Sequence, residues 1–266
     1  MLRITRTHPT GRPHSHRAIF IALSAVVFSL LALGATAAPA NAAVEDPLLA
    51  GVSCPDQNTD FRDAYVAPYG PVPGWTFIER QRRAYVCLFN AVRDRVGAPK
   101  LTACSQDATY CDIGAVAAYT RQQMADLSTA AQWKAMQVDY MCTWAGLSFD
   151  VRTSTWYQDP HKACGRAANY WLDRWRANNP GVSYTDWAEI LNVAYPYLTT
   201  PRAVVNDWLS EPFNSEGHRP HREYILDARF HYVGVGVTPA WYGSIAAGAP
   251  YNWGGFRQVI SSEFIN

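Results

Sequence analysis

The chemistry open to this sequence depends first on its histidines. Seven occur among the 266 residues, and three of them lie within residues 1–42, a leader that we expect to be removed. The mature chain then keeps only His161, His218, His221 and His231. Neutral imidazole and carboxylate oxygen together form a competent ligand set for zinc or a similar divalent ion. Any imidazole-based site must therefore draw on these four residues.

One carboxylate lies in an unusual setting. Glu189 is part of the apolar run Trp187-Ala-Glu-Ile-Leu191. A charged side chain in so apolar a segment is costly unless it is paired or coordinated. Glu189 is therefore the first acid of a candidate site, and a salt bridge to an arginine is the alternative. Glu211 and Glu216, near a polar turn that holds two of the histidines, are further candidate ligands.

That turn reads Glu216-Gly-His-Arg-Pro-His221. His218 and His221 could chelate a metal, but Pro220 between them would break a helix. Polar turn residues are mostly exposed, so we expect His221 to lie on a solvated turn. For His231, which lies in an aromatic, strand-like segment, we expect a place at the surface of a sheet.

Several common catalytic signatures are absent from the sequence. It contains neither the G-x-S-x-G elbow of serine hydrolases nor the H-E-x-x-H helix of zinc peptidases. Gly234-Val-Gly236 lacks the third glycine of a dinucleotide loop, and no Walker-type phosphate loop occurs. The sequence motifs therefore identify no catalytic residue.

The first 42 residues are typical of a signal peptide. Residues 1–17 carry arginines and no acid, Ala18–Leu33 is a 16-residue apolar run, and Ala40-Asn-Ala42 is a small-x-small cleavage signature. The run is shorter than the roughly 20 residues of a membrane-spanning helix, so an uncleaved anchor is the weaker alternative. We expect a secreted, extracellular chain that begins near Ala43 and keeps no integral membrane anchor.

Charge and cysteine content bound the partners and the compartment. Without the four arginines of the leader the chain has 19 basic and 22 acidic residues, which argues against a nucleic acid partner. The six cysteines, an even number, predict disulfides in an exported protein, with 15 pairings open. No C-x-x-C pair supports a zinc ribbon or a thioredoxin-type site. The cysteines are Cys54, Cys87, Cys104, Cys111, Cys142 and Cys164.

The spacing of apolar residues and the positions of Gly and Pro predict the helices and strands that would hold these residues. Residues 43–79 form an arm, rich in Pro and Gly up to residue 75, before the main domain, 80–266, and Cys54 could attach this arm to the body. Helical periodicity and stop signals predict helices at 77–96, 107–127, 133–141, 165–178 and from 201 onward. Strand composition predicts strands at 186–194, 230–238 and 256–264. These elements predict one mixed α/β domain.

The order of several segments resembles the CAP superfamily, also called the SCP domain. Leu88–Leu101 resembles the opening helix of that family, and His161–Arg166 the segment with its first histidine. Segments similar to its bacterial, secreted branch are Val204–Ser210, Gly217–Arg219, Tyr224–Asp227 and Val233–Val237. The resemblance spans residues 80–264 and implies an α-β-α sandwich with a central cleft. It implies a metal site of His161, Glu189, Glu211 and His218 there, with Glu216 as the rival of Glu211.

The residues and the resemblance together favour a secreted binding module. Its cleft could hold a divalent metal, with zinc as the first choice. Its partner would be a lipid or sterol-like small molecule, a cell-wall component or an extracellular protein. One alternative is a metal-dependent hydrolase of peptides or phosphodiesters, with Glu189 or Glu211 as the base. The other is a structural extracellular protein without metal. Because one fold hosts many functions, the resemblance does not make the chain an enzyme.

Overall fold

The computed structural model describes residues 44–61, 74–114, 116, 118–138, 161–162, 166–194, 198–238, 241–242 and 256–266. These ranges all lie within the unit Ala43–Asn266. The expected signal peptide, residues 1–42, lies outside them, as do Cys142 and Cys164.

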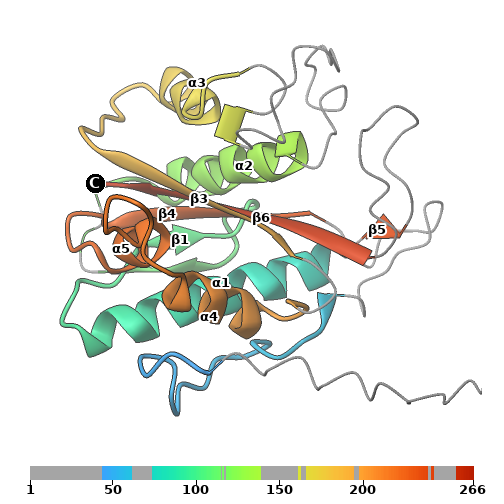
Figure 1. The fold of residues 1–266 in the computed structure, drawn as a ribbon. Coiled ribbons are helices and arrows are strands. Elements are labelled where there is room, and N and C mark those ends of the chain that lie inside the picture. The colour runs from blue at the N-terminus through green and yellow to red at the C-terminus, as the bar shows by residue number, and fades with distance from the viewer. Residues whose placement is uncertain are drawn as a thin grey trace, which may run out of the picture. The chain divides into compact units, whose positions relative to one another are not determined.

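The centre of the fold is an antiparallel sheet. Strands β3 (Trp187–Ala194) and β4 (Tyr232–Val237) flank β6 (Phe256–Ile265), and the short β5 (Trp241–Tyr242) pairs with the beginning of β6. Helices α2 (Arg121–Val138) and α3 (Tyr170–Asn178) lie on one side of the sheet, and α1 (Gly74–Arg95) and α4 (Pro201–Ser210) on the other (Figure 1). The prediction of a mixed α/β fold is confirmed, and the three predicted strands are present.

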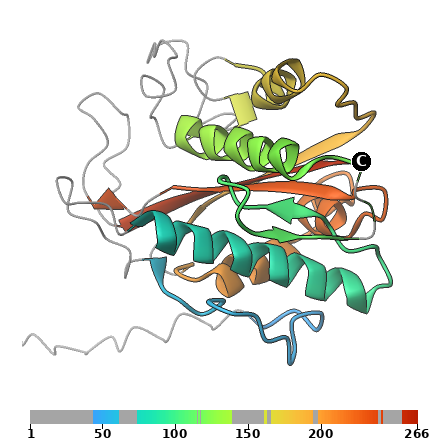
Figure 2. The same ribbon diagram turned by 180° about the vertical axis from the view of Figure 1, so that it is seen from behind.

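Three further elements belong to the described fold. The two-residue strands β1 (Ala103–Cys104) and β2 (Cys111–Asp112) form a small antiparallel pair next to β4, to which Thr102 is bridged. Figure 2 shows this pair from behind, between α1 and α2. The last helix, α5 (Pro220–Leu226), follows the polar turn after α4.

The two faces of the sheet have different chemistry. Toward α1 and α4 the strands present large apolar side chains that form the main core, including Ile190, Val233, Val235, Ile260 and Phe264. Toward α2 they present Glu189, Gly234, Gly236, Ser261 and Glu263. Small residues let the α2 backbone approach the sheet closely, and the two acids then need a partner on that helix.

The glycines of β4 are required by this close approach. A Cβ added to Gly234 would lie 2.5 Å from the carbonyl oxygen of Leu127, and one on Gly236 would lie still closer to that of Ala131. Both atoms belong to the backbone of α2, so no side-chain rotation relieves the clash.

We therefore expect Gly236→Ala to destabilise the fold by about 1–3 kcal/mol, the usual cost of overpacking. Urea unfolding of the mature, oxidised protein measures this change. A variant with Ala131→Gly in addition should be no more stable, because the clashing oxygen is main chain. An unchanged unfolding midpoint for Gly236→Ala would contradict this packing of α2 on β4.

The N-terminal arm is fixed to the body by a disulfide and by arginines. Cys54 is bonded to Cys87 of α1, as the prediction of an attached arm required. Arg202 of α4 donates to the carbonyls of Leu49 and Val52, and Arg222 of α5 donates to Asp46. Helix α1 begins at Gly74, so it starts inside the range 43–79 assigned to the arm. It ends at Arg95, and Gly97, with φ of +72°, supplies the predicted stop.

The helix predicted at 107–127 is wrong over its first two thirds. Cys104 and Cys111 form a disulfide that closes the β1–β2 turn, and α2 begins only at Arg121. Thr120 and Gln123 form a capping box there, because each side chain accepts the backbone N–H of the other residue. From this start α2 runs on through the piece predicted separately at 133–141 and ends at Val138.

Helices α4 and α5 both begin at a proline. Thr200 caps α4 by accepting the N–H of Ala203 at 3.2 Å, as its sequence predicts. Pro220, interpreted from sequence as a helix breaker, instead occupies the first helical position of α5. The buried Arg93 of α1 donates to the carbonyls of Ile225, Asp227 and Phe230 and so fixes the end of α5.

Among the helices of the described ranges, none is both long enough and apolar enough to cross a bilayer.

Candidate functional site

The first part of the site is built around Glu189 in β3. Its Oε1 lies 2.5 Å from Nδ1 of His161, and its Oε2 lies 3.1 Å from Nζ of Lys134. Glu189 and Lys134 are buried, whereas His161 is partly exposed. Lys134 comes from α2 and also donates to the backbone carbonyls of His161 and Ala168. One buried cation therefore compensates the acid and holds the segment that carries the histidine.

A second buried carboxyl group, that of Glu263, lies beside Glu189. The two residues are direct neighbours across β3 and β6. Burial first, and then the charge of Glu189, raises the pKa of Glu263 well above its ordinary value. Lys134 and Ser261 act in the opposite direction but are outweighed. Burial and the neighbouring negative charge therefore favour the protonated form of Glu263.

The second part of the site joins the end of α4 to α5. Oε2 of Glu211, the residue after α4, lies 2.6 Å from Nδ1 of His221, and Oε1 accepts the backbone N–H of Arg222. The imidazole of His221 also stacks on Trp208, with ring centres 6.2 Å apart. Burial, and to a lesser degree the charge of Glu211, raises the pKa of Asp207 on α4, while His221 lowers it. These contacts fix the orientation of the second imidazole.

The histidines of both pairs line one cavity of about 390 Å³, which we call the histidine cavity. His161, Glu189 and His221 supply its polar groups, and Trp187 and Tyr224 supply aromatic ones. The other described lining residues are Ala168, Ala188 and Pro220. Its wall thus combines an apolar surface with two imidazoles whose orientation is set by carboxylates.

The second histidine of the cavity is not the predicted one. The prediction of a solvated turn for His221 is wrong, because its side chain is only 31% exposed and lines the cavity from the first turn of α5. His218 lies on the turn before α5, is 60% exposed, pairs with Glu223 at 3.3 Å and does not line the cavity. Glu216 is exposed in the same turn. His231 lies just before β4, bonded through its backbone to Ile265.

The four predicted metal ligands thus divide into separate groups. His161 meets Glu189, Glu211 meets His221, and His218 lies apart. Within the part of the chain that the structure describes, no three His, Cys, Asp or Glu side chains are close enough to hold a metal ion together. The described arrangement fits two oriented imidazoles better than a closed centre of four ligands.

Sequence reasoning missed Lys134, Glu263 and the role of His221. Lys134 and Glu263 lie far from the other site residues in the sequence and reach them only through strand register and the packing of α2. A local signal existed for His221. The dipeptide His-Arg occurs twice in this turn, at 218–219 and 221–222, and only the second follows a proline that can start a helix.

Comparison with known proteins gives one distant structural neighbour. No family model matches the chain, and no curated protein matches it in sequence. A crystal structure of a cysteine-rich secretory protein from Staphylococcus aureus subsp. aureus Mu50 is similar, with a TM-score of 0.33 and 14% sequence identity. The match covers 68% of this chain and 36% of that one.

Proposed function

We propose that the protein is a secreted binding module of the CAP type whose histidine cavity takes a small, partly apolar ligand. One observation carries the proposal: two His–Glu pairs from separate elements, β3 and α5 among them, line or adjoin one cavity of about 390 Å³. Convergent polar groups in a mainly apolar cavity are typical of ligand sites. A lipid or sterol-like molecule with a hydrogen-bonding head group matches this wall best, and a cell-wall component or an extracellular protein could present the same group.

The contacts between the carboxylates and the imidazoles support a binding role for the two histidines. Because each Nδ1 is engaged by a carboxylate, the rings are held in place before a ligand arrives. Preorganised polar groups bind with less entropy loss than groups that must first be ordered. Secretion is supported by the two disulfides, Cys54–Cys87 and Cys104–Cys111, which are typical of exported proteins.

A divalent ion, zinc in particular, is the second candidate for the same cavity. The observation in its favour is that metal-binding histidines usually hold their other ring nitrogen against a carboxylate or carbonyl, as His161 and His221 do. Two imidazoles would leave positions for water or substrate, which a metal-dependent hydrolase requires. The module without an ion stands first, because the described residues form no three-ligand cluster.

The test uses mature protein purified from secretion medium without chelator. Native mass spectrometry should show a bound small molecule, and a fluorescent fatty acid should bind the same protein. We expect the double variant His161→Ala, His221→Ala to lose about 10- to 100-fold in affinity, the cost of two hydrogen bonds. The matched control, His218→Ala, should bind like the wild type.

Two results would contradict the proposal. One is an equal affinity in the double variant, and the other is a loss in His218→Ala alone. Zinc titration of the same three proteins separates the candidates. A stoichiometric ion that disappears only in the double variant would put the metal site first and justify hydrolase assays. Far-UV circular dichroism of the double variant checks that it remains folded.

A further inference from the structure

A second cavity, of about 400 Å³, lies between α1 and the turn that joins β1 to β2. It shares no described lining residue with the histidine cavity. We call it the arginine cavity. Its described lining residues are Glu79, Arg80, Arg82, Arg83, Gln106, Asp107 and Thr109. All of them are polar or charged, so the cavity suits a charged ligand and not a lipid chain.

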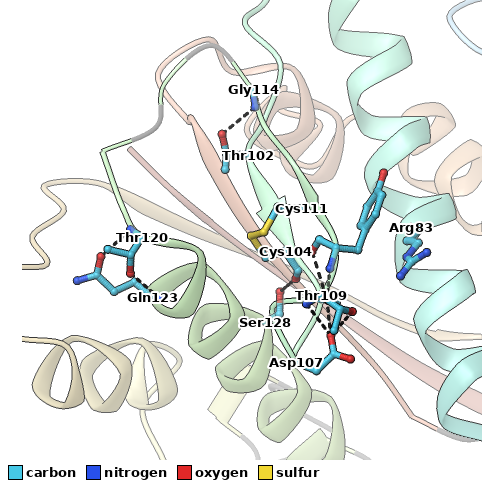
Figure 3. Close-up of a disulfide and its surroundings, with 12 residues drawn as sticks. Arg83, Thr102, Cys104, Asp107, Thr109, Cys111, Gly114, Thr120, Gln123 and Ser128 are labelled. Carbon is cyan, nitrogen blue, oxygen red and sulfur yellow. Dashed lines mark hydrogen bonds between the residues drawn. A yellow bond between two sulfur atoms is a disulfide. The ribbon is translucent and has the colours of Figure 1, made fainter.

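The wall formed by the turn is rigid. The Cys104–Cys111 disulfide closes it, and Figure 3 shows Asp107 and Thr109 on the turn, with Arg83 of α1 facing them. Oδ1 of Asp107 accepts the hydroxyl of Ser105 at 2.6 Å, and the hydroxyl and backbone N–H of Thr109 at 2.7 and 3.0 Å. These bonds lower the pKa of Asp107 to about 2. A ligand therefore meets a wall that needs no ordering.

The wall formed by α1 contains an ion pair between a buried arginine and a glutamate. Arg82 is buried, and it donates to Glu79 at 2.9 Å and to Gln132 at 2.5 Å. Arg82 therefore neutralises the charge of Glu79, the acidic residue of the helix wall. The positive charges of the other two arginines on this wall are then not needed to compensate it.

The guanidinium groups of the other two arginines, Arg80 and Arg83, donate no hydrogen bond in the described structure. Their nearest carboxylates, Asp56 and Glu79, lie 3.8 and 3.7 Å away, too far for a hydrogen bond. The side chains are 52% and 42% exposed, so a solute can reach them. The guanidinium of Arg83 lies over the ring of Tyr110, 4.1 Å from its centre. Stacking fixes the plane of the group and leaves its N–H edges for an acceptor.

We propose that the arginine cavity binds the phosphoryl group of a small phosphorylated ligand between Arg80 and Arg83. The two residues are three apart on α1 and are therefore neighbours on one helix face. A guanidinium fork matches phosphate oxygens, and a tetrahedral phosphate can accept from two forks at different angles. A carboxylate presents only two oxygens, whose lone pairs lie in one plane, so it fits two forks at different angles less well.

Asp107 gives this proposal a distinctive consequence. Its carboxylate lines the same cavity, and the other carboxylate among the described lining residues, that of Glu79, is bonded to Arg82. It therefore repels a phosphate dianion. Asn at this position keeps the Oδ1 acceptor that shapes the turn and removes only the charge.

The probe is inorganic phosphate, titrated at constant ionic strength into the oxidised mature protein and followed by calorimetry. We expect saturable binding on the order of millimolar, weakened about tenfold in Arg80→Gln and in Arg83→Gln. Asp107→Asn should bind about threefold more tightly, because a repulsive charge is lost. Arg176→Gln, an exposed arginine of α3, is the matched control and should bind like the wild type.

Glycerol 3-phosphate tests the identity of the ligand in the same protein. It should bind at least as tightly as inorganic phosphate and show the same response to the three cavity variants. The proposal is overturned if no saturation occurs, if Arg83→Gln binds like the wild type, or if acetate binds as tightly as phosphate. Failure of glycerol 3-phosphate to bind would likewise overturn it. None of these results depends on the histidine cavity.

Discussion

Lys134→Met should destabilise the mature protein by about 3–5 kcal/mol at neutral pH, the usual cost of removing one partner of a buried ion pair. Lys134 is buried on α2, and its ammonium group lies 3.1 Å from Glu189. Methionine fills a similar volume with an unbranched side chain, so the packing of α2 is retained. What is lost is the buried ammonium group that is paired with Glu189 and whose charge also acts to lower the pKa of Glu263.

The test is guanidinium chloride unfolding of the oxidised protein, with Lys100→Met as the matched control. Lys100 is exposed, so its replacement should change the free energy of unfolding by less than about 0.5 kcal/mol. Adding Glu189→Gln to Lys134→Met should recover part of the loss, because the uncompensated charge is then removed. If Lys134→Met is as stable as the wild type, or the double variant is less stable than Lys134→Met, the ion pair does not have this role.

The fold could be predicted from sequence wherever the signal was local. The apolar run of β3, the Thr200-Pro201 start of α4 and the stop at Gly97 each depend on a few adjacent residues, and each is present. The helix predicted at 107–127 failed because its apparent periodicity competes with a disulfide. Bonding Cys104 to Cys111 forces a tight turn, and sequence alone leaves 15 pairings open.

In the candidate site, too, sequence could predict the residue with a local signal but not the one that depends on long-range packing. Glu189 could be singled out because a carboxylate in an apolar run demands a partner, and both interpretations of it are partly met. It lies against an imidazole, as a site residue would, and it is in a salt bridge, although with a lysine and not an arginine. Its second neighbour, Glu263, could not be found this way. Their contact depends on the register of β3 against β6, which is set by long-range packing.

Glu263 should make stability fall as the pH rises, and Glu263→Gln should remove that fall. The pKa of Glu263 is raised in the folded state by burial and by Glu189, whereas an unfolded glutamate titrates near about 4.3. Between these two pKa values the folded chain binds a proton that the unfolded chain has lost. The stabilising contribution is therefore complete below about pH 4.3 and decreases as the pH rises toward the folded pKa.

The measurement is the difference in unfolding free energy between wild type and Glu263→Gln from pH 5 to pH 8, in buffer with chelator. As the pH rises, we expect the unfolding free energy of Glu263→Gln to increase relative to that of the wild type by up to about 1.4 kcal/mol per pH unit, since one proton is involved. Taking the difference cancels groups such as Asp107 and Asp227, whose lowered pKa values give the opposite slope. The exposed Glu216→Gln should show no such gain. A difference that stays constant across this range would mean that Glu263 is ionised in the folded protein, and the two buried acids would then need a second cation besides Lys134.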